Sequence, residues 1–206
     1  MKQTLLAALA AASLTAAGNA ALLAYTMTGT GVAGSVAGTA FTNATLTVTW
    51  TRDTASSTGR ISGNSANLVY EGLVVSPTIS IASSAGNWSG SMLLGQGVDQ
   101  WQAVTALFTN SPQSSRIFMN GTSASGPVSV FGLFADGGGL FIDMLAPASV
   151  SAVFASDGGP FDASFGTVAL DNSVTGNGTF TIAEVPAPGG AAVTIVAGIV
   201  ARRRRR

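Results

Sequence analysis

Few side chains in this 206-residue chain could perform chemistry, and the commonest catalytic groups are missing from it. The sequence contains no histidine and no cysteine, so the Ser-His and Cys-His nucleophile arrangements are excluded. Carboxylates are left, and two pairs lie close together in the sequence: Asp136 with Asp143, and Asp157 with Asp162. Glycoside hydrolases use a pair of carboxylates as their catalytic groups. Both pairs lie in glycine-rich segments typical of turns, so we expect no catalytic activity and keep glycoside hydrolysis as a distant alternative.

Loop aspartates could also supply oxygen ligands to calcium. The candidates are Asp136, Asp157, Asp162 and Asp171. Their spacing matches neither the EF-hand loop nor the calcium-binding nonapeptide repeat. Aspartate commonly stabilises turns without any metal. The sequence therefore predicts no cofactor, with a bound calcium ion as the alternative.

A binding surface is indicated by four threonines that alternate with apolar residues: Thr45, Thr47, Thr49 and Thr51. Alternate residues of a strand share a face, so these side chains would form a row of methyl and hydroxyl groups. Such a row could contact a glycan, or ordered water as in the T-x-T surfaces of ice-binding proteins. The simpler interpretation is that threonine favours strands and faces solvent here.

Two tryptophans, Trp88 and Trp101, are candidate platforms for stacking against a sugar ring. Tryptophan in a small β domain is more often part of the core. Both interpretations remain open from the sequence.

The elements that must position these residues are short strands. Period-two or β-rich segments are predicted at residues 25–30, 42–51, 66–75, 78–82, 89–94, 104–109, 116–120, 128–134, 140–145, 149–154, 161–170 and 178–185. Glycine, proline and asparagine separate them, as expected of tight turns. The pattern predicts an all-β fold with a single antiparallel β-sandwich or jelly-roll domain. A helix at residues 98–107 is an alternative for one segment, because apolar residues recur there at a spacing of three.

The two ends of the chain differ from its middle. Lys2, an apolar run at residues 5–14 and small residues up to Ala20 have the three regions of a secretory signal peptide, with cleavage expected after Ala20. We therefore expect a signal helix at residues 1–20, a β domain at residues 21–185 and a separate tail at residues 186–206.

Charge is distributed unevenly between these parts. Six of the nine basic residues belong to the ends, so three basic residues face nine acidic ones in the body, a net charge of −6. Nucleic-acid binding requires clustered cations, which this body lacks. We expect no nucleic-acid partner.

The tail joins three unlike features in order. Pro186, Ala187 and Pro188 precede an uncharged stretch at residues 189–201, which is followed by Arg202, Arg203, Arg204, Arg205 and Arg206. This arrangement resembles the PEP-CTERM sorting signal of bacterial exported proteins, with Ala187 in the place of the usual glutamate. The resemblance implies temporary retention in the inner membrane and processing near the prolines by an exosortase, a membrane transpeptidase. It also implies release to the cell surface or the extracellular space of bacteria that make exopolysaccharide.

The length of the apolar stretch agrees with a transient anchor. Thirteen residues form a helix of about 20 Å, short of the roughly 30 Å hydrocarbon core. The positive-inside tendency would keep the arginines cytoplasmic and the acidic body outside. The alternative is an apolar terminal element that completes the core.

Together these features predict an exported structural or adhesive protein of the cell surface or extracellular matrix. A polysaccharide-binding, ice-binding or surface-binding β module is the nearest alternative.

Overall fold

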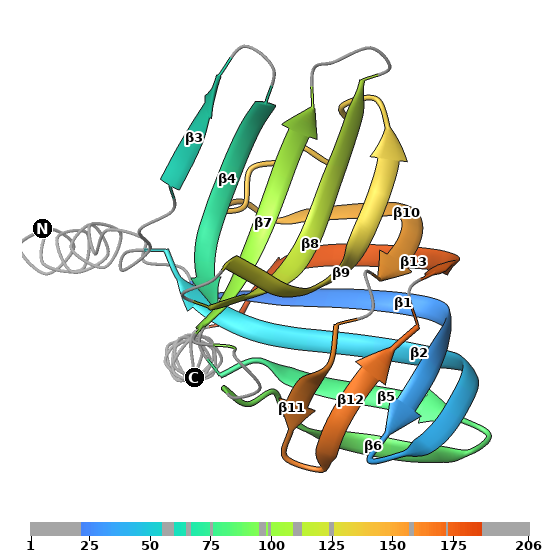
Figure 1. The fold of residues 1–206 in the computed structure, drawn as a ribbon. Helices are drawn as coiled ribbons and strands as arrows, with labels where there is room; N and C mark the ends of the chain where they lie inside the picture. Colours follow the sequence, from blue (N-terminus) through green and yellow to red (C-terminus); the bar gives the residue numbers. More distant parts are fainter. Residues whose placement is uncertain are drawn as a thin grey trace, which may run out of the picture.

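The structure is a computed structural model that describes residues 22–54, 60–64, 67–74, 76–94, 98, 100–108, 113–123, 126–156, 159–171 and 173–186. Within these residues the chain is all-β and every strand pairing is antiparallel, as the sequence predicts (Figure 1). The signal segment and the tail beyond Pro186, with the helix predicted in each, lie outside the described residues.

The strands are β1 (Leu22–Val36), β2 (Thr39–Asp53), β3 (Arg60–Asn64), β4 (Asn67–Val74), β5 (Thr78–Ser83), β6 (Gly86–Ser91), β7 (Gln100–Phe108), β8 (Ser114–Ser123), β9 (Gly126–Asp136), β10 (Ala148–Ser156), β11 (Phe161–Ala163), β12 (Gly166–Leu170) and β13 (Ser173–Glu184). The segment at 98–107, for which a helix was an alternative, lies mostly in strand β7. The predicted strand at 161–170 is divided into β11 and β12 by a turn at Ser164 and Phe165.

The strands form one curled sheet in the order β3-β4-β7-β8-β9-β10-β13-β1-β2-β5-β6. In Figure 1, β10, β13, β1, β2, β5 and β6 run across the molecule, whereas β4, β7 and β8 rise steeply from them. Residues 131–134 of β9 pair with β10, and their backbone hydrogen bonds join these two groups of strands. The sheet is therefore continuous and curls into a half-barrel, and the predicted sandwich or jelly roll is not confirmed.

The β11–β12 hairpin closes the lower part of the curl. β12 pairs with the last residues of β1, and β11 meets the end of β6 through a bridge between Ala163 and Met92. On either side of the bridge, Leu93 N donates to Asp162 O at 2.8 Å and Ser164 N donates to Ser91 O at 2.9 Å. Backbone pairing therefore runs in a closed circuit through β1, β2, β5, β6, β11 and β12, which protects the edge of β6.

Alternation along β1 and β2 places every second side chain in the core. The Tyr25 and Trp50 rings face each other across these strands, stacked with centroids 5.2 Å apart and planes 6° apart. Phe180 of β13 packs beside them, 5.9 Å from Trp50. This aromatic group anchors the strands whose opposite face is described below.

The segment at 140–145 is a loop, so its prediction as a strand is wrong. Its apolar residues Leu140 and Met144 are buried because the loop covers the core rather than joining the sheet. The Tyr25 hydroxyl donates to Met144 O at 2.6 Å, and the Thr105 hydroxyl donates to Leu140 O at 2.6 Å. Burial without strand pairing explains why composition alone misled the prediction.

Candidate functional site

A surface of serine and threonine hydroxyls covers six adjacent strands, β10, β13, β1, β2, β5 and β6. Two cross-strand ranks of six residues each make up this hydroxyl surface. The first rank is Ser149, Thr181, Thr26, Thr49, Thr78 and Ser91, and the second is Ser151, Thr179, Thr28, Thr47, Ser80 and Ser89. All twelve side chains are exposed or half-buried. The four-threonine pattern of the sequence thus belongs to a larger two-dimensional array, of which Thr47 and Thr49 are central members.

Neighbouring hydroxyls of the array contact one another. Thr49 Oγ1 and Thr78 Oγ1 lie 2.6 Å apart, and Ser149 Oγ and Thr181 Oγ1 lie 3.4 Å apart. Each hydroxyl carries one donor and two acceptor positions, so these contacts leave hydrogen-bonding capacity for water or a ligand. No charged residue belongs to either rank.

The array follows from strand alternation combined with register. Between the two ranks lies one row of residues whose side chains point inward. This row includes Phe180, Met27, Val48 and Ile79, which are buried. A one-residue slip of any strand would turn its apolar set outward, so burial fixes the register that aligns the hydroxyls. Thr45 and Thr51, the other two predicted threonines, are exposed on the same face of β2 beyond the two ranks.

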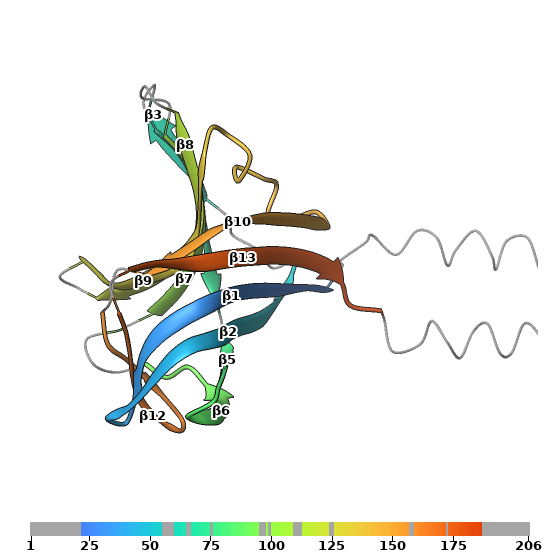
Figure 2. The ribbon, with the colours of Figure 1, turned by 90° about the vertical axis from the view of Figure 1, so that its right-hand side faces the viewer.

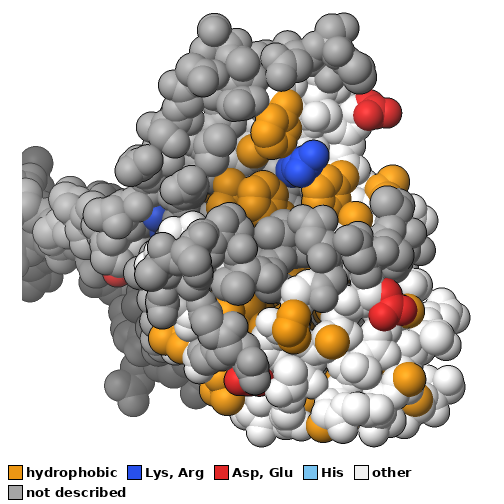
Figure 3. Space-filling model, in the orientation of Figure 1, with side chains coloured by type: hydrophobic (Ala, Val, Ile, Leu, Met, Phe, Trp, Pro, Cys, Tyr) orange, Lys and Arg blue, Asp and Glu red, His pale blue; other side chains and the backbone are white. Residues whose placement is uncertain are grey.

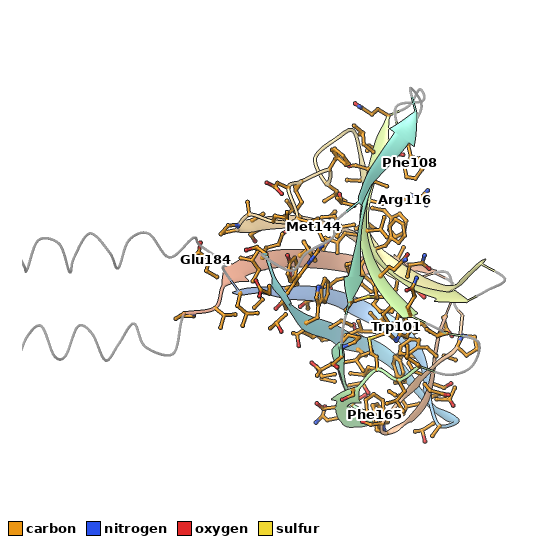
Figure 4. All side chains as sticks on the ribbon, turned by 90° about the vertical axis from the view of Figure 1, so that its left-hand side faces the viewer. Trp101, Phe108, Arg116, Met144, Phe165 and Glu184 are labelled. Carbon is orange, nitrogen blue, oxygen red and sulfur yellow. The ribbon has the colours of Figure 1, made fainter. Side chains whose placement is uncertain are left out.

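A second site candidate is an exposed arginine held between two aromatic rings. The guanidinium carbon of Arg116 on β8 lies 4.9 Å from the ring centroid of Phe108 on β7 and 4.9 Å from that of Phe134 on β9. Arg116 and Phe134 are directly opposed in register. Figure 4 shows Phe108 and Arg116 on one side of the sheet and Met144 on the other.

This arginine borders a surface groove of about 310 Å³ lined by Ser114, Ser115, Arg116, Phe134, Ala135, Asp136 and Val153. We call it the Arg116 groove. Val153 is 43% exposed and adds an apolar wall. Figure 3 shows hydrophobic side chains around a basic one on this face of the molecule. Within the described residues, Arg116 contacts the two rings, and no carboxylate forms an ion pair with it.

The predicted tryptophan platforms do not join the hydroxyl surface. Trp101 is 2% exposed; it packs edge-on against Phe161 at 5.6 Å, and its indole NH donates to Leu93 O at 3.2 Å. Trp88 is half-buried on the inner face of β6, where it packs 6.0 Å from Phe41. The prediction of Trp101 as a ligand platform is therefore wrong, since its ring is enclosed by the core.

Two of the aspartates proposed for catalysis or calcium accept local hydrogen bonds. Asp143 Oδ1 accepts a hydrogen bond from Leu145 N at 2.8 Å, and Asp162 Oδ1 accepts one from the Thr167 hydroxyl at 2.8 Å. Asp136 borders the Arg116 groove and Asp171 is exposed, whereas Asp157 lies outside the described residues. No group of three or more acidic side chains in the described part of the chain is arranged to hold a metal ion.

The two ends of the described chain lie side by side. Leu23 of β1 pairs with Glu184 of β13, and Val185 N donates to Leu22 O at 2.8 Å. The first and last described strands therefore begin and end at neighbouring points of the sheet. Of the predicted sorting residues only Pro186, which is exposed, is described; Ala20, Ala187, Pro188 and the arginines lie outside. Within residues 22–186 as described, no helix is long and apolar enough to cross a bilayer.

Comparisons of the chain with protein-family models, curated proteins and solved structures gave no match.

Sequence reasoning missed most of the hydroxyl surface and all of the Arg116 groove. Ser149, Ser151, Thr179 and Thr181 show the same alternation as β2, so the array had a signal in the sequence. The groove had no such signal, because its residues come from three strands, β8, β9 and β10, whose order depends on the topology.

Proposed function

We propose that this chain is an exported structural or adhesive domain, without catalytic activity, that presents its hydroxyl surface at the cell surface or in an extracellular matrix. The observation that supports the proposal is the pair of six-residue ranks, in which every member is serine or threonine. Neighbouring strands lie about 4.8 Å apart, and alternate residues of one strand lie about 6.7 Å apart, so the two ranks offer repeated donors and acceptors to a hydroxyl-rich polymer.

The expected adhesion is weak at each contact and depends on many contacts. Exchanging a hydrogen bond to water for one to a glycan contributes only about 0.5–1.5 kcal/mol. No aromatic side chain belongs to either rank, so stacking of the kind that gives lectins their affinity is not supplied there. The surface suits a matrix component that holds a hydrated polymer through area rather than through one tight site.

A curved surface favours a flexible polymer over a crystal face. Sheets twist by about 20–25° from strand to strand, or roughly 100° over six strands. The curl is visible in Figure 2. Ice or a crystalline polysaccharide would require a plane of this width, so we place the ice-binding alternative behind the matrix role.

Export and sorting form the second part of the proposal. The tail that resembles a PEP-CTERM signal would hold the domain transiently at the inner membrane until an exosortase releases it. The neighbouring positions of Leu22 and Val185 support anchorage at one membrane, because a signal peptide and a membrane tail would both reach the bilayer from one side of the domain.

Isosteric substitutions test the hydroxyl surface. We expect a Thr28→Val, Thr47→Val, Thr49→Val and Thr78→Val variant to lose most retention on exopolysaccharide-coated beads, because valine keeps the branched shape and removes the hydroxyl. The matched control replaces the same four threonines with serine, which keeps the hydroxyl and removes the methyl, and should retain binding. Loss in the serine variant with retention in the valine variant would contradict the proposal.

Export is tested separately by intact-mass analysis of the protein from membrane and culture fractions of the native cells. We expect a secreted form that lacks the signal peptide and ends near Pro186. An uncleaved chain found only in the cytoplasm would refute the sorting role.

A further inference from the structure

The Arg116 groove combines three kinds of contact within one small site. Arg116 supplies guanidinium donors, Asp136 supplies carboxylate acceptors, and Phe134 with Val153 supplies apolar walls. Ser114, directly opposite Asp136 in register, adds a hydroxyl that donates and accepts. A matching ligand carries a carboxylate, several hydroxyls and an apolar face.

We propose that the Arg116 groove binds a carboxylate-bearing sugar residue of an acidic polysaccharide. A uronic acid has the three required features: its carboxylate would pair with Arg116, its hydroxyls would donate to Asp136, and the C–H face of its ring would lie against Phe134 and Val153. This site shares no residue with the two ranks of the hydroxyl surface, and each proposal is tested with its own variants, so the failure of one can be told from the failure of the other.

The two rings prepare the arginine for this role. Contact with Phe108 and Phe134 restrains a side chain that would otherwise lose much rotamer freedom on binding. The guanidinium fork matches a carboxylate through two parallel hydrogen bonds, and such charged contacts are stronger than neutral ones. Among the described residues, no carboxylate forms an ion pair with Arg116.

The dimensions of the groove agree with one saccharide unit of a longer chain. A volume of about 310 Å³ lies at the lower end of the roughly 300–1,000 Å³ typical of small-ligand sites. The groove lies at the surface, bordered by the exposed residues Arg116, Asp136 and Val153, so neighbouring sugar units could continue beyond it. Residues 21–185 carry a net charge of −6, which opposes unspecific attraction of a polyanion to this part of the chain and makes a specific cation necessary there.

The test uses the full chain in detergent micelles, titrated by calorimetry with tetragalacturonate and with its methyl ester. The ester removes the negative charge while keeping the hydroxyls and the ring. We expect saturable binding of the acid and at least tenfold weaker binding of the ester, a difference of ~1.4 kcal/mol or more. Equal binding of the two probes, or no saturable binding of the acid, would overturn the proposal without reference to any variant.

Variants then assign the binding to Arg116. Arg116→Gln should weaken tetragalacturonate binding at least tenfold, and Arg116→Lys should recover only part of it, because lysine keeps the charge and loses the fork. Arg52→Gln is the charge-matched control on β2 and should bind like the unaltered chain. Equal losses in Arg52→Gln and Arg116→Gln would show that overall charge, rather than this groove, decides binding. Comparing galacturonate with tetragalacturonate separates a site for free sugar acids from one for a polymer: the proposal requires tighter binding of the tetramer.

Discussion

The Tyr25 hydroxyl donates a buried hydrogen bond to the carbonyl oxygen of Met144 at 2.6 Å, joining residues 119 positions apart. Tyr25 lies in the first strand of the sheet, and Met144 lies in the loop between β9 and β10. The contact therefore fixes the loop over the core beneath the strands that carry the hydroxyl surface.

Removing this donor tests its contribution. Tyr25→Phe keeps the ring that stacks on Trp50 and leaves a buried carbonyl without its donor. We expect the free energy of unfolding to fall by about 1–3 kcal/mol, measured by urea denaturation. An unchanged midpoint would mean that another group satisfies the Met144 carbonyl.

The same loop is held at Leu140 by two hydroxyls. The Thr105 hydroxyl donates to the carbonyl oxygen of Leu140 at 2.6 Å, and the amide of Leu140 donates to Ser115 Oγ at 3.0 Å. Thr105→Val and Ser115→Ala should each lower stability by about 1 kcal/mol and speed amide exchange in residues 137–147. The double variant should cost less than the sum of the two, because both contacts hold one residue. Thr105→Ser keeps the hydroxyl and serves as the control.

Close packing over a glycine gives a third prediction. A Cβ added at Gly29 would lie 2.5 Å from ring atoms of Phe154, so Gly29→Ala must displace this buried ring. We expect a loss of about 1–3 kcal/mol in thermal or chemical unfolding. Combining Gly29→Ala with Phe154→Leu should cost less than the two single changes added together. Simple additivity would show that the clash is relieved elsewhere.

The hairpin between β1 and β2 carries backbone strain that a substitution can reduce. Ala37 and Gly38 both have positive φ, 47° and 82°, which is the pattern of a type I′ turn. Asparagine tolerates this conformation better than alanine, so Ala37→Asn should raise stability by about 0.5–1 kcal/mol, seen as a higher Tm.

Gly38→Ala is the matched test of the same turn. No heavy atom lies within 4 Å of a Cβ built at Gly38, so any cost comes from the backbone alone. We expect a loss of about 1–2 kcal/mol. A neutral Gly38→Ala together with a neutral Ala37→Asn would contradict the turn assignment.

Processing near Pro186 should leave the domain intact. A chain ending at Pro186 keeps the pairing of Glu184 with Leu23 and the Val185 N to Leu22 O hydrogen bond. Its Tm should therefore equal that of the full chain. A chain ending at Thr181 loses Ile182, which is 2% exposed, and should unfold at a markedly lower temperature. Equal Tm values for the two truncated chains would show that the end of β13 contributes nothing.

The sequence by itself determined the all-β class, the position of most strands and the outward threonines of β2, because strand alternation is a local property that each segment carries alone. It did not determine residues 140–145, where an apolar composition serves a loop that covers the core.

Only the tertiary structure decided which strands are neighbours. Register aligned serines and threonines from six strands into the hydroxyl surface, since each strand had to bury its own apolar face. Strand order likewise brought Phe108, Arg116 and Phe134 together from β7, β8 and β9 and placed Trp101 in the core. These contacts depend on pairing between distant segments, and the spacing of residues within one strand does not indicate which other strand it pairs with.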